Sequence, residues 1–355
     1  MSSLSDATLE RLRRTLAAPD LGGARYELLE LIGQGGMGTV YRATDHELGR
    51  EVAVKLLRDA APDPRAVQRL LQEARVIAQL EHPGIVPVHD VGQLSDGRVY
   101  YVMKLVRGSR LDHHFHPSSP LDGRLRVFER VCETVAFAHA HGIIHRDLKP
   151  ENVMVGDFGE VLVLDWGVAK LRHTPEVPAQ DDAAPSASSV LFSAQDTRTR
   201  QTADGTVIGT PAYMSPEQAR GEIDQVDERS DVFALGAILH FLLTGTAPNT
   251  PSIFERQRHD PATTVSVAGR LPRSAPRALA AVCRKALDPD PARRYASASQ
   301  LAAEIARFRS GQRGAAHREG ALEWIGRLGW NYRTPLLLVL AYLLMRILLA
   351  FWKPA

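Results

Sequence analysis

The spacing of apolar residues predicts two strands and a helix in the first quarter of the chain. Apolar side chains alternate with other residues along 51–57, which is the period of a half-buried strand. Residues 39–43 include β-branched and aromatic side chains and indicate a second strand. Between residues 64 and 80 the period becomes helical, with apolar residues at Val67, Leu70, Leu71, Ala74, Ile77 and Ala78. This part of the chain is therefore predicted to form strands followed by an amphipathic helix.

The longest apolar run lies near the C-terminal end, in residues 335–352, where Arg346 is the only charged residue. Residues 336–352 number 17, which is the short limit for a helix that spans a bilayer. Eleven of them are Leu, Ile, Val or Phe. Together these favour insertion by roughly 3 to 7 kcal/mol, against about 3 kcal/mol for the arginine. We therefore expect a transmembrane helix, and a helix packed on the rest of the chain or on a partner is the alternative.

Composition is that of an ordinary globular protein and excludes some functions. The chain has 355 residues, 44% of them hydrophobic and 24% charged, which suits two lobes with additional segments. A formal net charge of +2 gives no electrostatic case for binding nucleic acid. Cys132 and Cys283 fall in predicted helices and suit small core residues in a reducing compartment. The histidines of residues 112–116 lack the accompanying ligands of a known metal site, and residues 2–20 lack the apolar core of a signal peptide.

A glycine-rich segment, Leu31–Val40, reads Gly-x-Gly-x-x-Gly-x-Val. Glycines at Gly33, Gly35 and Gly38 let a backbone approach phosphate groups because no Cβ stands between them. Dinucleotide-binding folds use a similar run, but there the loop opens a helix. Here the following residues indicate a strand. A phosphate-binding loop between two strands is therefore favoured over dinucleotide binding.

The stretch His145–Asn152 places an acid, a lysine and an amide within six positions. Phosphoryl transfer to a hydroxyl needs a carboxylate that orients the attacking oxygen, a cation near the γ-phosphate and an oxygen ligand for Mg²⁺. Asp147, Lys149 and Asn152 supply one of each. The stretch resembles the catalytic loop of eukaryotic-type (Hanks-type) protein kinases. Residues 209–219 are most similar to the bacterial transmembrane serine/threonine kinases of this family.

Other kinase motifs follow in order, and the resemblance implies a site for ATP. Residues 51–57 fit the strand that carries the family's lysine, so Lys55 is expected to hold the α- and β-phosphates. Glu73 resembles the acidic partner of that lysine, and a solvent-exposed glutamate is the alternative. Met103 stands at the gatekeeper position, followed by a hinge whose backbone at Lys104 and Val106 is expected to bond adenine. The residues expected to contact ATP are Ile32, Gly33, Gln34, Gly35, Gly36, Met37, Gly38, Val40, Ala53, Lys55, Met103, Lys104 and Val106.

The metal-binding aspartate of the family has two candidates. Residues 156–159 spell Asp-Phe-Gly after a glycine, but they begin too soon after Asn152 for the hairpin that the family places between amide and aspartate. Asp165 follows an apolar strand and leaves room for that hairpin. The resemblance therefore implies that Asn152 and Asp165 hold Mg²⁺ or Mn²⁺, and that Asp157 is a turn residue. Trp166 replaces the usual phenylalanine and is expected to fill the same apolar slot.

Three further positions match residues that stabilise the structure of the large lobe in this family. Glu217, in a motif where Ser215 replaces the usual alanine, is expected to pair with Arg294. Asp231 is expected to accept backbone hydrogen bonds from the catalytic loop. The catalytic set implied by the resemblance is Asp147, Lys149, Lys55 and Glu73.

The resemblance implies a two-lobe α+β fold, with a small antiparallel sheet carrying one helix and a larger, mainly helical lobe. It covers about residues 24–309. The expected division is an N-terminal extension 1–23, a kinase domain 24–309 with lobes 24–106 and 107–309 and an activation segment 165–217, a juxtamembrane linker 310–334 and a transmembrane helix 335–352.

The family resemblance also implies regulation and substrate. Lys149 is typical of kinases that act on serine and threonine. Arg146, directly before the catalytic aspartate, is common in kinases that need a phosphate in the activation segment. The middle of that segment, residues 175–193, is rich in Ala, Ser, Pro and Asp. Autophosphorylation is expected in the part of the segment that follows, at one or more of Thr197, Thr199, Thr202 and Thr206, with Thr202 and Thr206 favoured.

The implied location is the cytoplasmic membrane, with a single span. A kinase domain must face ATP, so it is expected in the cytoplasm; Arg327 and Arg333 suit that side of the membrane. Only three residues follow Trp352, so no sensor domain is expected beyond the span. Expected partners are protein substrates and a second copy for trans-autophosphorylation. The alternative is a pseudokinase scaffold that binds ATP without turnover, although no catalytic position is substituted.

Overall fold

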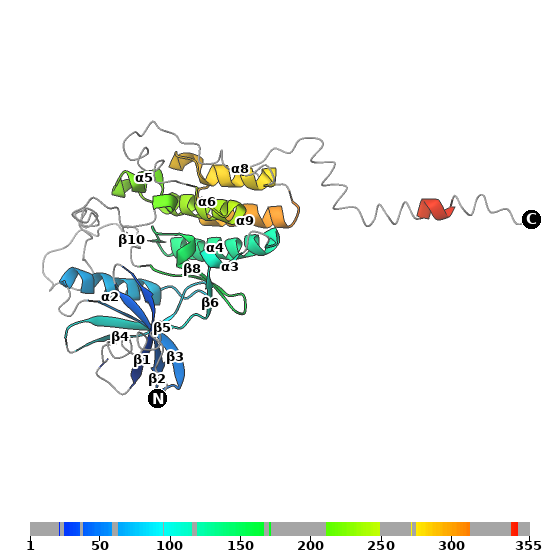
Figure 1. Ribbon diagram of the computed structural model, residues 1–355. Helices are drawn as coiled ribbons and strands as arrows, with labels where there is room; N and C mark the ends of the chain where they lie inside the picture. The colour runs from blue at the N-terminus through cyan, green and yellow to red at the C-terminus, as the bar shows by residue number, and fades with distance from the viewer. Residues whose placement is uncertain are drawn as a thin grey trace, which may run out of the picture.

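The computed structural model consists of two lobes and one short C-terminal helix (Figure 1). The smaller lobe is built on a β-sheet and the larger one is mainly helical. The predicted two-lobe α+β fold is therefore confirmed. The residues that the structure describes are 21, 25–35, 38–58, 63–94, 96–115, 119–166, 170–171, 211–248, 271, 275–312 and 342–346.

The small lobe is an antiparallel sheet of five strands in the order β1-β2-β3-β5-β4, with one helix, α2, against β4 and β5. The elements are β1 (Tyr26–Gln34), β2 (Thr39–Asp45), β3 (Arg50–Leu56), α2 (Pro64–Ala78), β4 (Val88–Gln93) and β5 (Val99–Lys104). The glycine-rich loop thus joins two strands, as the sequence predicts.

Helix α2 begins at Pro64, whose fixed φ suits a first helical turn. The Asp63 side chain caps it by accepting the backbone N–H two residues further on, at 3.0 Å. Its buried face includes Leu70 and Ala74, as the apolar stripe predicts, but also the charged residue Glu73. A buried carboxylate on an apolar face needs partners, and these lie in the sheet.

The large lobe is organised around α6, which is buried along most of its length and packs against α4, α8 and α9. Asp227 caps its first turn, and Gly245 ends it with a φ of 77°, which favours glycine. The helices and strands are β6 (Gly108–Arg110), α3 (Leu111–His114), α4 (Leu121–Ala140), β7 (Ile143–Ile144), η1 (Pro150–Asn152), β8 (Val153–Gly156), β9 (Val161–Val163), β10 (Lys170–Leu171), η3 (Pro211–Tyr213), α5 (Pro216–Ala219), η4 (Ile223–Gln225), α6 (Glu228–Thr244), α8 (Arg277–Ala286), η6 (Pro291–Arg293) and α9 (Ala298–Arg309).

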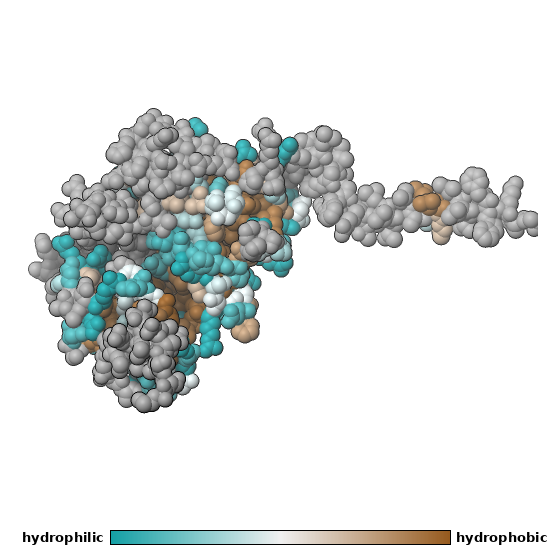
Figure 2. Space-filling view, viewed as in Figure 1, coloured by the Kyte–Doolittle hydropathy of each residue, from teal (hydrophilic) through white to brown (hydrophobic). Residues whose placement is uncertain are grey.

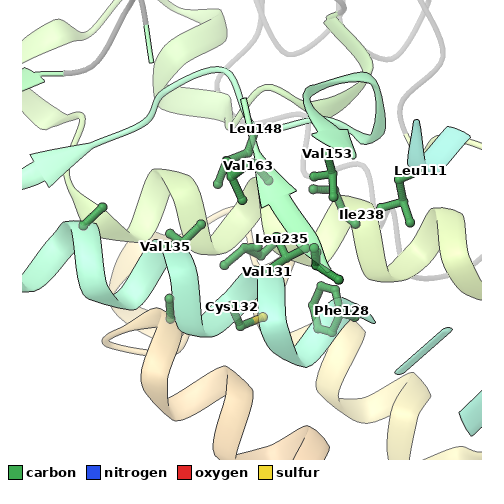
Figure 3. Packing of buried hydrophobic residues seen from close by; sticks show 14 of the residues in the cluster. Leu111, Phe128, Val131, Cys132, Val135, Leu148, Val153, Val163, Leu235 and Ile238 are labelled. Atoms are coloured by element: carbon green, nitrogen blue, oxygen red, sulfur yellow. The ribbon is translucent and has the colours of Figure 1, made fainter. Parts of the chain in front are cut away.

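One apolar core runs beneath the catalytic loop. Figure 3 shows residues of this core, with Leu235 of α6 beside Val131 of α4, and Val163 of β9 beside Leu148 of the catalytic loop. Cys132 and Cys283 are free, buried thiols within it. The catalytic loop, residues 145–152, is therefore supported by the hydrophobic core, to which its Leu148 belongs.

A second set of contacts joins the two lobes behind the site. The backbone N–H of Val163 donates to the carbonyl of Gly84 at 2.8 Å, and Ile85 forms a parallel bridge with Val163. A Cβ at position 84 would lie 2.0 Å from the hydroxyl oxygen of Thr134 on α4. Only glycine fits this close approach, which brings the residues after α2 against the large lobe.

The C-terminal helix spans residues 342–346, within the predicted transmembrane segment. Tyr342, Leu343, Leu344 and Met345 are each at least half exposed, and Figure 2 shows this helix as a mainly hydrophobic patch apart from the lobes. None of the helices in the described part of the chain has the length and hydrophobicity needed to cross a bilayer.

Candidate active site

Lys55 on β3 and Glu73 on α2 form an ion pair between the sheet and the helix. The Nζ of Lys55 donates to both carboxylate oxygens of Glu73, at 2.6 and 2.9 Å. The two side chains are 12% and 0% exposed. Burial disfavours the ammonium, but the Glu73 and Asp165 carboxylates outweigh it and hold the pKa of Lys55 above its ordinary value. Lys55 is therefore a cation at neutral pH.

Tyr101 on β5 also contacts this pair, and nothing in the sequence singled it out. Its hydroxyl donates to the Oε1 of Glu73 at 2.9 Å, and the residue is 2% exposed. In the sequence it is one more aromatic residue in a strand. The signal that could identify it is strand register, because Tyr101 lies directly opposite Lys55 in the β3–β5 pair.

The catalytic loop brings Asp147, Lys149 and Asn152 together. The Nζ of Lys149 donates to the Oδ2 of Asp147 at 3.0 Å. The amide nitrogen of Asn152 donates to the backbone oxygen of Asp147 at 2.8 Å and lies 3.4 Å from Oδ2. These side chains are therefore mutually oriented, as the spacing of the motif suggests.

Asp165 follows β9 with a φ of 60°, a left-handed conformation uncommon outside glycine. Its Oδ1 lies 3.4 Å from the Nζ of Lys55, so the strand end faces the ion pair of the small lobe. Burial acts to raise the pKa of Asp165, but the Lys55 ammonium overcomes it and keeps the value below the ordinary one. Trp166 is buried, as expected, and its indole N–H donates to the carbonyl of Val163 at 3.2 Å.

The backbone of the catalytic loop is held from below by Asp231 of α6. Its Oδ2 accepts the N–H of His145 at 2.8 Å and its Oδ1 accepts the N–H of Arg146 at 2.9 Å. The Nε2 of His139 lies 2.8 Å from the same Oδ2. Burial acts to raise the pKa of Asp231, but the hydrogen bonds with His139 and with the backbone N–H of His145 hold it below its ordinary value.

Glu217 and Arg294 form the buried pair that the resemblance implies. The guanidinium donates to both oxygens of Glu217, at 2.7 and 2.8 Å, and the side chains are 1% or less exposed. Arg294 also donates to the carbonyls of Asp288, Arg229 and Pro289. The guanidinium thus has an acceptor for each of its five N–H bonds.

By strand register, four of the expected ATP contacts, Val40, Ala53, Lys55 and Met103, lie on one face of the small-lobe sheet. Ile32, Gly33 and Gln34 end β1, and Val40 lies on β2 opposite Lys55. Ala53 pairs with Met103 across β3 and β5, and Lys104 ends β5 just before Val106. Gly35 and Gly38 close the loop by a backbone hydrogen bond of 2.9 Å. Gly36 and Met37 lie outside the described residues.

The rival aspartate, Asp157, lies elsewhere. It is exposed in the turn between β8 and β9, next to Phe158, which is 98% exposed. The structure therefore places Asp165, not Asp157, beside Lys55, and has the hairpin that the spacing predicts.

The residues present fit a nucleotide with a divalent cation. The bond from the Asn152 amide nitrogen leaves the amide oxygen for a metal ion, and the Asp165 side chain is 46% exposed. No cluster of three or more His, Cys, Asp or Glu residues suited to a metal occurs within the described residues. Mg²⁺ takes one or two protein carboxylates and completes its shell with phosphate and water oxygens, so Asn152 and Asp165 fit as its protein ligands.

Several predictions from the sequence lie outside the described residues. These are the threonines Thr197, Thr199, Thr202 and Thr206, the N-terminal extension up to residue 20, and most of the linker and of the segment 335–352.

Comparison with known proteins agrees with the geometry. The protein kinase domain family matches residues 26–305. The serine/threonine-protein kinase PknD of Chlamydia muridarum is 33% identical over 341 residues, which cover 88% of this chain and 34% of that protein. PknD of Chlamydia caviae is 34% identical over 352 residues, which cover 92% of this chain and 36% of that protein. The chain spans about a third of the length of these relatives. With its lysine–glutamate pair, catalytic loop and second aspartate in one site, the chain belongs to the protein kinase family.

Proposed function

We propose that this chain is an ATP-dependent serine/threonine protein kinase. The observation that carries the proposal is the convergence of two groups of side chains. Lys55, held by Glu73, lies 3.4 Å from Asp165, and the Asp147–Lys149–Asn152 group lies on a loop fixed by Asp231. Cations and carboxylates so arranged suit phosphoryl transfer, where positioning and charge neutralisation supply most of the catalysis.

Each residue has a distinct role in this proposal. Lys55 binds phosphate oxygens, and Asp147 orients the attacking hydroxyl and accepts its proton. Lys149, 3.0 Å from Asp147, adds positive charge where the transferred group carries negative charge. Asn152 and Asp165 would hold a divalent cation, which neutralises phosphate charge when bound.

Activation-segment phosphorylation is part of the proposal. The Nε and one terminal nitrogen of Arg146 are buried and have no hydrogen-bond partner among the described residues, whereas its backbone N–H donates to Asp231. Burial lowers the pKa of this guanidinium, but an arginine remains charged. A partly buried cation with no partner among the described residues is stabilised by a nearby negative charge, and a phosphate on a threonine between Thr197 and Thr206 would supply that charge.

The preference for serine and threonine is supported by Lys149 and by the names of the PknD relatives. Trans-autophosphorylation within a homodimer follows as a proposal, because a membrane anchor would raise the local concentration of the kinase. The anchor itself, at residues 335–352 with the kinase domain in the cytoplasm, rests on hydropathy and on the exposed apolar residues 342–345.

The test is phosphoryl transfer by the full chain, purified in lipid or detergent. Mg-ATP labelled at the γ-phosphate is added to the wild type and to Asp147→Asn, whose amide cannot accept a proton. Label on the wild type alone, mapping to residues 197–206 and to added protein substrates, supports the proposal. Tight ATP binding without transfer in either protein contradicts it and identifies the chain as a scaffold. Rate constants that rise with protein concentration would support reaction between two copies.

A further inference from the structure

We infer that Tyr101 is a positioning residue, which keeps Glu73 and helix α2 in place while Lys55 serves the nucleotide. The inference rests on the proposed kinase function and deepens it. It assigns a task to a residue outside the set of Lys55, Glu73, Asp147, Lys149, Asn152 and Asp165.

The geometry places Tyr101 between the sheet and the helix. It faces Lys55 directly across the β3–β5 pair, and the Lys55 Nζ is 5.9 Å from the centroid of its ring. Its hydroxyl reaches the Oε1 of Glu73 at 2.9 Å. The tyrosine is thus a direct link from the central strand β5 to helix α2, independent of the lysine.

The hydrogen bonds of Lys55 show why a second link matters. An ammonium has three N–H donors. Those of Lys55 are directed at the two oxygens of Glu73 and at Asp165, with Nζ–O distances of 2.6, 2.9 and 3.4 Å. When Lys55 turns an N–H toward a phosphate oxygen, at least one of these contacts weakens.

Glu73 cannot replace a lost contact with water, because its side chain is 0% exposed. A buried carboxylate oxygen left without a donor is strongly unfavourable. The Tyr101 hydroxyl stays on Oε1 in either case, so Glu73 keeps one donor and α2 keeps its position. Burial and the Glu73 carboxylate raise the pKa of Tyr101 well above its ordinary value, so the hydroxyl retains the proton that it donates.

The first arm of the test compares two single hydroxyl deletions in the full chain. Tyr101→Phe removes the donor and keeps the buried ring. Tyr100→Phe is the matched control, because Tyr100 is the neighbouring strand residue and its hydroxyl makes no hydrogen bond within the described part of the chain. Tyr101→Phe should lower kcat/KM for Mg-ATP about tenfold, equivalent to about 1.4 kcal/mol. Tyr100→Phe should stay close to wild type.

The second arm asks whether Tyr101 acts through Glu73. Glu73→Ala removes the group that the hydroxyl holds, so adding Tyr101→Phe to it should change kcat/KM by less than about twofold. Equal effects of Tyr101→Phe in both backgrounds would overturn the inference. So would a lower melting temperature of Tyr101→Phe with kcat/KM unchanged, since that result describes a purely structural hydrogen bond.

A third measurement separates this inference from the proposed function. It is the affinity for Mg-ATP, measured by calorimetry, of the wild type, Tyr101→Phe, Glu73→Ala and the double variant. If the wild type binds Mg-ATP but transfers no phosphate, the proposed function fails. Weaker binding in Tyr101→Phe, absent in the Glu73→Ala background, would then still support the role of Tyr101. Equal binding in wild type and Tyr101→Phe, or no binding at all, would overturn it.

Discussion

Removing one partner of the buried pair of Glu217 and Arg294 is predicted to be among the most destabilising single substitutions in the large lobe. The perturbation is Glu217→Ala. It removes the acceptor of two guanidinium N–H bonds, at 2.7 and 2.8 Å, and the acceptor of the Ser230 hydroxyl at 2.7 Å. Three backbone carbonyls remain around Arg294, but its positive charge then lies in a site from which solvent is excluded.

The magnitude follows from that charge. Breaking a buried pair by removing one partner costs about 3 to 5 kcal/mol, because the other charge is left uncompensated. A domain of this size is stable by only about 5 to 15 kcal/mol. Each kcal/mol lowers the melting temperature of a domain of about 150 to 250 residues by about 2 to 4 °C, so a fall of roughly 10 °C is expected for the large lobe. The interaction of Arg294 with the ring of Phe233, 5.0 Å away, does not replace a carboxylate.

The assay is urea unfolding of the full chain, followed by circular dichroism and by tryptophan fluorescence, to which the buried Trp166 contributes. Arg293→Ala is the control, because the neighbouring side chain is 76% exposed and its pair with Asp290 is long, at 3.6 Å. It should change the free energy of unfolding by less than about 0.5 kcal/mol. The double variant Glu217→Ala/Arg294→Ala should cost clearly less than the sum of the single variants. A loss below about 1 kcal/mol for Glu217→Ala, with an unchanged urea dependence, would refute the reasoning.

Three further predictions concern the site and its support. Gly38→Ala should raise the KM for ATP about tenfold, because its Cβ would lie 2.4 Å from a backbone carbonyl, whereas Gly35→Ala meets nothing within 4 Å and should bind ATP nearly as wild type does. Asp165→Asn should lower kcat by about 100-fold or more, while Asp157→Asn, in an exposed turn, should leave kcat within about twofold; equal losses would reverse the assignment. The pKa of Asp231 is lowered in the folded state, so its contribution to stability is complete above the ordinary value of 3.8 and is lost as pH falls below it. Unfolding free energies measured from about pH 5 to pH 2 should fall less steeply in Asp231→Asn, and an unchanged slope would contradict this.

The motifs of the site could be predicted because each depends on local spacing. Asp165 was favoured over Asp157 since only the former leaves room for a hairpin after Asn152, and β8 and β9 form that hairpin. Glu73 is identified by its resemblance to the family's helical glutamate, within the apolar stripe of residues 64–80, and its burial against Lys55 excludes the solvent-exposed alternative. In both cases the chemical constraint lies within one or two neighbouring elements.

Contacts between distant elements could not be predicted in the same way. Tyr101 meets Glu73 only once β5 lies beside β3 in a particular register, and a shift of one residue would turn the hydroxyl to the other face. His139 reaches Asp231 across 92 positions of sequence, because α4 and α6 pack together. In the sequence, a histidine near a helix end gives no indication of that partner.

The hydrogen bond between Val163 and Gly84 joins the two lobes close to the candidate active site, where it can serve as a pivot. The strand that leads to Asp165 is fastened at this point to the residues that follow α2, the helix of Glu73. A lobe rotation that keeps this bond turns about residues 84–85, so points near it move less than the outer tip of the sheet. Lys55 and Asp165 would then change their separation little as the lobes rotate. When the lobes open for nucleotide exchange, the largest displacement would therefore occur at the glycine-rich loop, and the smallest near residues 84–85.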